Sequence, residues 1–135
     1  MFVFCLERGV KPKKILRFYF GADSLERAFD NLITSKAFDT EGDALENAEK
    51  ICLIIDEKMR LERLWTYLDG IISILSGEEK SVLMHYSARR VPAIGEAERR
   101  AVRRAVIKFT RRARRLNDFE EAFNILKKYY CLISV

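Results

Sequence analysis

Hydrophobic and polar positions separate most clearly between residues 96 and 116, EAERRAVRRAVIKFTRRARRL. This stretch contains no Gly or Pro, and its Ala, Arg and Glu residues favour a helix. At about 100° per residue the apolar side chains fall within about 40° of one line. These side chains are Val102, Val106, Phe109, Ala113 and Leu116. The spacing predicts a helix with one face packed on a hydrophobic core.

The opposite side of this predicted helix is densely basic, with Arg100, Arg103, Arg104, Lys108, Arg111, Arg114 and Arg115, and Arg99 and Arg112 lie at its margins. Like charges at i, i+4 disfavour a helix by a few tenths of a kcal/mol per pair, and a solvated helix face usually mixes the two signs. We therefore expect an anionic partner. Ile107 lies at about 140° from the apolar line. It could contact a thymine methyl group or a protein, or be exposed by chance.

Capping signals predict the starts of four further helices. A capping box pairs a side chain at the helix start with a Glu three residues later, and four pairs have this spacing: Asp23 with Glu26, Asp43 with Glu46, Ser76 with Glu79, and Asn117 with Glu120. The first helix should end near Ala37, and Pro92 and Gly95 should end the third. Outside the second helix, the expected buried positions are Leu25, Ala28, Phe29, Leu32, Ile33, Val82, Leu83, Tyr86, Phe119, Phe123, Leu126 and Tyr130.

The longest periodic segment runs from Ala44 to Leu75, about 48 Å as one helix at 1.5 Å per residue. Its first half has apolar residues at alternating spacings of three and four, which predicts a buried face: Leu45, Ala48, Cys52, Ile55 and Met59. The register continues less regularly through Leu61, Leu64, Trp65, Leu68, Ile71, Ile72 and Leu75. A helix of this length exceeds a compact small domain. A homodimer through residues 43–75 and a kink at Gly70 are both open explanations.

Residues 1–21 give no regular helical signal. MFVFCL is strand-like, but a lone strand is not stable, and Gly9 and Pro12 interrupt the segment. We expect an irregular N-terminal segment whose apolar residues around Phe18 pack on the helices. The predicted architecture is one all-α domain, 1–135, with about five helices. It comprises an acidic helical scaffold (23–75), a basic helix-turn-helix-like part (76–116) and a C-terminal helix (117–135).

The basic charge is concentrated in one part of the chain. The whole chain has 25 Lys or Arg and 20 Asp or Glu, a net charge of +5. Residues 87–116 contain 11 of the basic and 2 of the acidic residues, a net of +9, so the remainder carries −4. A local excess of this kind favours a docking surface over general cationic character.

Composition also bears on the compartment and on chemistry. The three cysteines, Cys5, Cys52 and Cys131, form no C-x-x-C pair, which favours reduced thiols in a cytoplasmic protein. No apolar run approaches the ~18 residues of a membrane span, so we expect no membrane partner. His85 is the single histidine, and motifs for nucleophilic, phosphate-binding or zinc chemistry are missing from the sequence. We expect no enzymatic activity, no cofactor and no metal.

Two segments resemble a known DNA-binding family. LSGEEKSVLMHY, from Leu75 to Tyr86, resembles the first helix of the region 4 domain of sigma-70-type factors, and FTRRARRL, from Phe109 to Leu116, is similar to the end of that domain's recognition helix. Small phage and mobile-element regulators look similar. The resemblance covers about 40 residues and implies a helix-turn-helix that reads promoter-like DNA. The family's middle helix would fall on residues 88–97, ARRVPAIGEA, where this chain has Pro92.

These observations lead to two functional hypotheses. The first is a DNA-binding transcriptional regulator that contacts duplex DNA through residues 96–116, because arginine forks bind phosphates and a helix fits the major groove. The alternative is a protein–protein interaction or self-assembly module whose basic helix docks an acidic protein surface. Arginines covered by Asp and Glu would favour the alternative, and arginines bare on one convex face would favour DNA.

Overall fold

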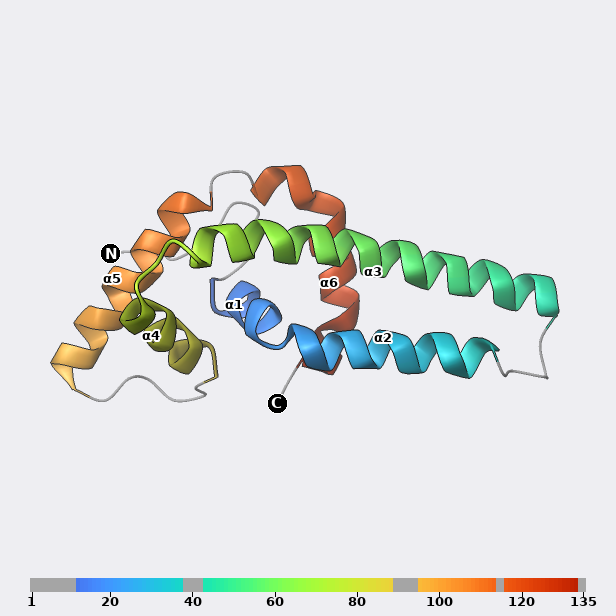
Figure 1. Ribbon diagram of the computed structural model, residues 1–135, viewed down its shortest axis with the longest axis horizontal. Helices are drawn as coiled ribbons and strands as arrows, with labels where there is room; N and C mark the ends of the chain where they lie inside the picture. The colour runs from blue at the N-terminus through green and yellow to red at the C-terminus, as the bar shows by residue number, and fades with distance from the viewer. Residues whose placement is uncertain (1–11, 38–42, 89–94, 114–115, 134–135) are drawn as a thin grey trace.

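The computed structural model describes residues 12–37, 43–88, 95–113 and 116–133, excepting the side chains at 116, 117 and 130–133 (Figure 1). Every regular element in these ranges is helical, which confirms the all-α class for this part of the chain. In order they are α1 (Pro12–Phe20), α2 (Ala22–Ala37), α3 (Ala44–Ile72), α4 (Gly77–Ala88), α5 (Glu96–Arg112), the 3-10 turn η2 (Leu116–Phe119) and α6 (Glu120–Ile133). The described ranges thus hold six α-helices, where about five were predicted.

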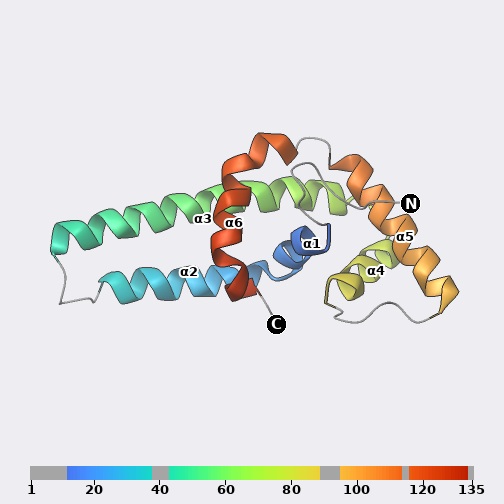
Figure 2. The same cartoon turned by 180° about the vertical axis from the view of Figure 1, so that it is seen from behind.

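The helices form an elongated arrangement around α3. Helices α2 and α3 lie side by side as an antiparallel hairpin, and α6 crosses them near the middle of α3 (Figures 1 and 2). Helices α4 and α5 pack together at the opposite end from the hairpin's tip. Helix α1 lies between the two groups and contacts α2, α3 and α4. The basic helix is therefore at one end of the molecule and the hairpin's tip is at the other.

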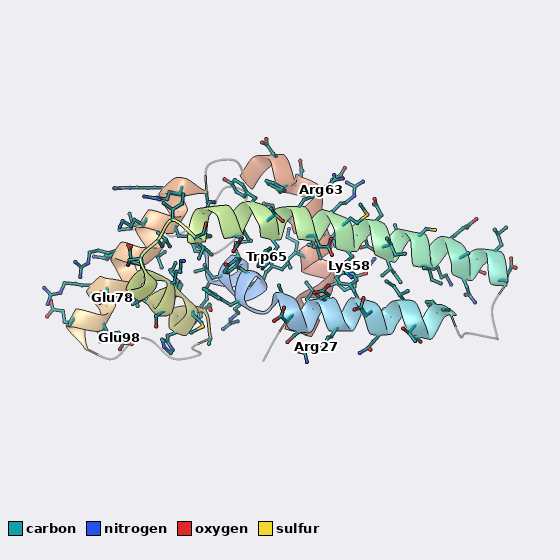
Figure 3. All side chains as sticks on the ribbon, viewed as in Figure 1. Arg27, Lys58, Arg63, Trp65, Glu78 and Glu98 are labelled. Atoms are coloured by element: carbon teal, nitrogen blue, oxygen red, sulfur yellow. The ribbon has the colours of Figure 1, made fainter. Side chains whose placement is uncertain are left out.

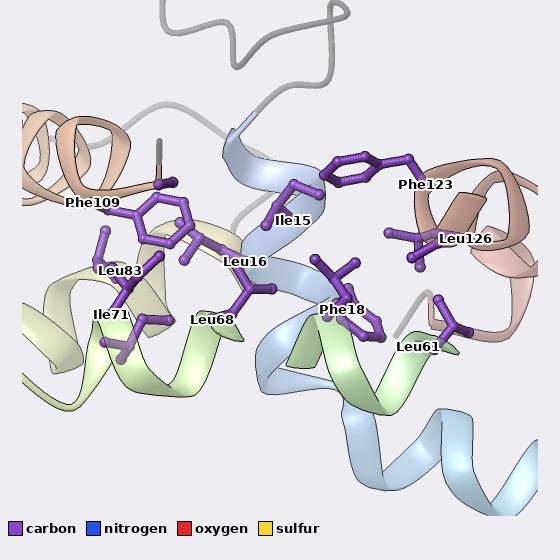
Figure 4. Packing of buried hydrophobic residues seen from close by; sticks show 14 of the residues in the cluster. Ile15, Leu16, Phe18, Leu61, Leu68, Ile71, Leu83, Phe109, Phe123 and Leu126 are labelled. Carbon is purple, nitrogen blue, oxygen red and sulfur yellow. The ribbon is translucent and has the colours of Figure 1, made fainter. Parts of the chain in front are cut away.

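Helix α1 corrects the prediction of an irregular segment over 1–21, while residues 1–11 lie outside the described part. Pro12 is the first helical residue, where its missing N–H costs nothing. Ile15, Leu16 and Phe18 are at most 2% exposed, at the centre of the core (Figure 4). On one side of them lie Leu83 and Phe109, and on the other Leu61, Phe123 and Leu126.

Polar contacts hold α1 to α3. The Trp65 indole N–H donates to the Tyr19 carbonyl oxygen at 3.0 Å, and the two rings stack with centroids 5.3 Å apart. The Tyr19 hydroxyl donates to Asp69 Oδ1 at 2.7 Å. Burial and the Asp69 carboxylate raise the pKa of Tyr19 to about 12, so this hydroxyl keeps its proton and remains a donor at neutral pH.

The predicted buried face in the first half of α3 is wrong. Leu45, Ala48, Cys52, Ile55 and Met59 are all exposed. Between Asn47 and Leu61, α3 instead turns its other side toward the core, and from Leu61 to Ile72 the buried residues remain on that side. The covered side of the first half carries the polar residues Asn47 and Glu57, so apolar spacing within this helix indicates the wrong side. The helix is continuous through Gly70 and ends at Ile72.

A buried carboxylate on α3 fixes the crossing of α6. Glu57 is 6% exposed, although a glutamate in the middle of a helix is usually exposed to solvent. Its Oε1 atom lies 3.2 Å from Lys128 Nζ, and the Tyr129 hydroxyl donates to the same oxygen at 3.2 Å. A buried charge needs such partners. Tyr129 is buried, and the side chain of Tyr130, which was expected there, lies outside the described residues.

Some of the predicted helix starts agree with the structure more closely than others. Asp43 caps α3 by accepting from the Leu45 N–H at 3.2 Å, while Glu46 pairs with Lys50. Helix α2 already begins at Ala22, so Asp23 lies in its first turn, and α2 ends at Ala37 as predicted. Leu25 and Phe29 are buried, whereas Leu32 is 36% exposed. Asn117 lies in η2, and α6 begins three residues later.

Candidate nucleic-acid interface

Helix α5 presents an apolar side to the core and a basic side outward. Val106, Phe109 and Ala113 are buried as predicted, Ala105 is buried with them, and Val102 is half-buried against the core. Gly95 precedes the helix at φ 87, a conformation that L side chains rarely adopt. The Phe109 ring lies against Leu83 and Leu16 (Figure 4). Burial on α4 and α1 therefore determines which side of α5 faces outward.

The predicted basic residues within α5 are all exposed: Arg99, Arg100, Arg103, Arg104, Lys108, Arg111 and Arg112. Figure 3 shows long nitrogen-tipped side chains pointing away from the body along this helix. Arg114 and Arg115 lie outside the described residues. Arg100, Arg104 and Arg111 follow i, i+4, i+11, close to one line down the helix opposite the buried side. The fold thus presents a row of guanidinium groups to the solvent.

Few of these cations are neutralised within the described parts of the chain. Lys108 Nζ forms an ion pair with Glu79 Oε2 of α4 at 2.9 Å, and Arg99 and Arg111 also have interactions within the protein. Arg100, Arg103, Arg104 and Arg112 form no ion pair with any described residue. Their charges are therefore available to an external anion.

Ile107 is half-buried, although its position predicted exposure among the arginines. Its neighbours one turn away include Arg103, Arg104 and Arg111, whose aliphatic stems can cover apolar surface. A covered isoleucine has less surface to offer to a thymine methyl group. The surface is therefore better suited to phosphates than to reading bases through this residue.

The start of α4 couples the two helices of the C-terminal half. Ser76 Oγ accepts from the Glu79 N–H at 3.1 Å, and Glu79 Oε1 accepts from the Ser76 N–H at 3.1 Å, which confirms the predicted capping box. The other carboxylate oxygen of Glu79 binds Lys108. Hydrogen bonds from Lys108 and the Ser76 backbone lower the pKa of Glu79 from 4.5 to about 2. Sequence spacing indicated the cap but not its link to α5.

This carboxylate predicts an acid-dependent stability. Because the pKa of Glu79 is lower in the folded chain, its contribution is fully present above pH 4.5 and is lost as the pH falls toward 2. We expect Glu79→Gln to lower the thermal midpoint near neutral pH. Below pH 4.5 the thermal midpoint of this variant should fall less steeply with pH than that of the native chain. Thermal unfolding across that range measures this. Glu78→Gln, an exposed carboxyl on the same turn, is the control, and identical pH profiles for the native chain and Glu79→Gln would contradict the assignment.

Helix α1 supports this end of the molecule through a residue that the sequence interpretation did not single out. Arg17 Nε donates to the Ser87 carbonyl oxygen at 2.8 Å, at the last turn of α4. A cation at a helix C-terminus satisfies an unpaired carbonyl and interacts favourably with the helix dipole. The i, i+3, i+4, i+7 spacing of Pro12, Ile15, Leu16 and Tyr19 is the signal that could have revealed α1.

Among the described residues, no three or more His, Cys, Asp or Glu side chains lie close enough to hold a metal ion. His85 is exposed on α4. None of the described helices is long and apolar enough to cross a membrane.

Comparison with known proteins gives no match: no protein-family model, no curated protein and no solved structure matches the chain.

Proposed function

We propose that this protein is a DNA-binding transcriptional regulator that contacts duplex DNA through α5. The observation that carries the proposal is the exposed basic surface of α5, on which Arg100, Arg103, Arg104 and Arg112 have no ion-pair partner among the described residues. Planar guanidinium groups bind phosphate oxygens bidentately. The resemblance of residues 75–86 and 109–116 to sigma-70 region 4 supports a role in transcription.

The shape and anchoring of α5 suit a nucleic-acid duplex. Its 17 residues extend about 25 Å, and an α-helix fits the ~12 Å width of the major groove. Phe109, Val106 and the Lys108–Glu79 pair hold the helix before any ligand binds. A preorganised surface avoids part of the entropy cost of association. Phosphate contacts by Arg100, Arg103, Arg104 and Arg112 would dominate the binding energy.

The test is the salt dependence of binding to a random-sequence duplex, measured by fluorescence anisotropy. Four phosphate contacts release about four counterions, so the affinity should fall roughly 100-fold between about 50 and about 200 mM salt. A slope near zero would contradict phosphate contact. If binding is detected, selection from a pool of random duplexes would identify any preferred sequence.

The second candidate is an interaction module whose basic helix docks an acidic protein surface. The Lys108–Glu79 pair favours it to a limited extent, because it shows one cation of α5 neutralised by a carboxylate. Arginines available for an external anion suit either an acidic protein or DNA. Failure to bind any duplex at about 50 mM salt, where phosphate contacts are strongest, would favour this candidate over the regulator.

A further inference from the structure

The exposed apolar side of α3 is a second surface that the proposed function does not use. We name it the outer stripe: Leu45, Ala48, Cys52, Ile55 and Met59. Leu45, Ile55 and Met59 are 67%, 42% and 49% exposed. At 100° per residue the stripe lies roughly opposite the side that carries Leu61, Leu64 and Leu68. In the first half of α3 the fold therefore covers the side that carries Asn47 and Glu57 and leaves the apolar stripe exposed.

The stripe lies on a projecting part of the molecule. The hairpin of α2 and α3 extends beyond α6, and no other described helix lies beside its tip (Figures 1 and 2). Its members are spaced 3, 4, 3 and 4 residues apart, the a/d pattern of a coiled-coil seam. A seam of this period matches the surface of another helix along about 21 Å, which a small ligand would not fill.

The charges beside the stripe allow two copies related by a two-fold axis to attract each other, because an acidic residue of one copy approaches a basic residue of the other. Glu49 and Arg63 lie on the same edge of α3, two heptads apart, and both are exposed. When two copies of the stripe run antiparallel, the acidic end of one lies opposite the basic end of the other. Asp56, near the centre of that edge, is already paired with Arg60 at 2.9 Å. An isologous contact of this kind uses the same patch on both chains.

We propose that the outer stripe binds a second copy of this chain in an antiparallel helix pair. Each stripe fills the spaces between the side chains of the other, and Glu49 of one chain approaches Arg63 of its partner. The contact is small, so we expect a dissociation constant on the order of 10 µM. This inference does not depend on DNA binding, because the stripe and α5 lie at opposite ends of the molecule (Figure 1).

Sedimentation equilibrium of the full chain, from low micromolar to near-millimolar concentration, tests the proposal. We expect a mass that rises from 15.8 kDa toward twice that value. Ile55→Glu should weaken dimerisation roughly 100-fold, because it places a carboxylate in the contact between the two chains without a positively charged partner. Leu53→Glu is the matched control, since Leu53 is 56% exposed on the same helix but lies off the stripe. It should leave the dissociation constant within about two-fold of the native value.

Charge exchange tests the antiparallel orientation. Arg63→Glu should weaken the dimer about five-fold through two lost pairs, and the double variant Glu49→Arg, Arg63→Glu should restore it. A chain that remains a monomer throughout, as it would if residues 1–11 cover the stripe, overturns the proposal. So does a dimer that Ile55→Glu leaves intact. Tighter dimerisation by Arg63→Glu overturns the antiparallel orientation. Circular dichroism shows whether each variant is folded.

Discussion

The double variant Arg100→Glu, Arg104→Glu is expected to bind a random-sequence duplex on the order of 100-fold more weakly than the native chain at about 50 mM salt. Both arginines are exposed on the outward row of α5, and neither has an ion-pair partner among the described residues. Removing two phosphate contacts should also reduce the slope of log K against log salt by about two. Anisotropy titrations at several salt concentrations measure both quantities.

The matched control is the double variant Arg27→Glu, Lys127→Glu, which changes the net charge by the same amount. Arg27 and Lys127 are exposed on α2 and α6, away from α5 (Figure 3 labels Arg27). We expect this control to lose affinity by less than about ten-fold, through long-range charge alone. Equal losses in the two double variants would indicate a general charge effect and not an interface on α5. No loss in either would remove α5 from the proposed function.

Leu16→Ala is expected to lower the free energy of unfolding by about 2–5 kcal/mol, since it removes a fully buried side chain at the centre of the core. Leu16 is 0% exposed and lies between α4, α5 and α3 (Figure 4). The substitution leaves a cavity beside Phe109 and Leu83, where α5 is anchored. Urea unfolding followed by circular dichroism measures the change. A loose N-terminal segment, as the sequence alone suggested, would make the cost small.

Leu53→Ala is the control for this stability prediction, because it makes the same chemical change at a site that is 56% exposed. We expect a loss of less than about 0.5 kcal/mol. A comparable loss at both positions would mean that α1 is no more important to the core than the surface of α3. Loss of duplex binding by Leu16→Ala under conditions where the chain stays folded would further link α1 to the orientation of α5.

The sequence predicted the interface helix well because its signals are local. The single apolar seam of α5 contains no competing second face, so Val106, Phe109 and Ala113 could be identified as buried from spacing alone. The caps at Asp43 and Ser76 were equally predictable, since a side chain there meets a backbone N–H within three residues. The availability of the arginines could not be predicted, because it depends on which carboxylates other helices bring near them.

Two errors in the fold have a common cause. Helix α1 is only nine residues long, and an isolated helix of that length is marginal in water. Contacts of Ile15, Leu16 and Phe18 with other helices, together with Trp65 and Asp69, stabilise it. In the first half of α3 the side that becomes buried likewise depends on long-range contacts, such as that between Glu57 and Lys128 of α6.

The sequence by itself determined the all-α class of the described residues, the caps of α3 and α4, and the division of α5 into an apolar and a basic side. Each of these follows from interactions within one or two helical turns, which depend on neighbours along the chain. Only the tertiary structure decided that α1 is a helix, that α3 leaves the outer stripe exposed, and that Glu79 reaches Lys108. Those outcomes depend on which helices pack against one another. The periodicity of one helix can show which of its sides is apolar, but it does not show which other helix packs on that side.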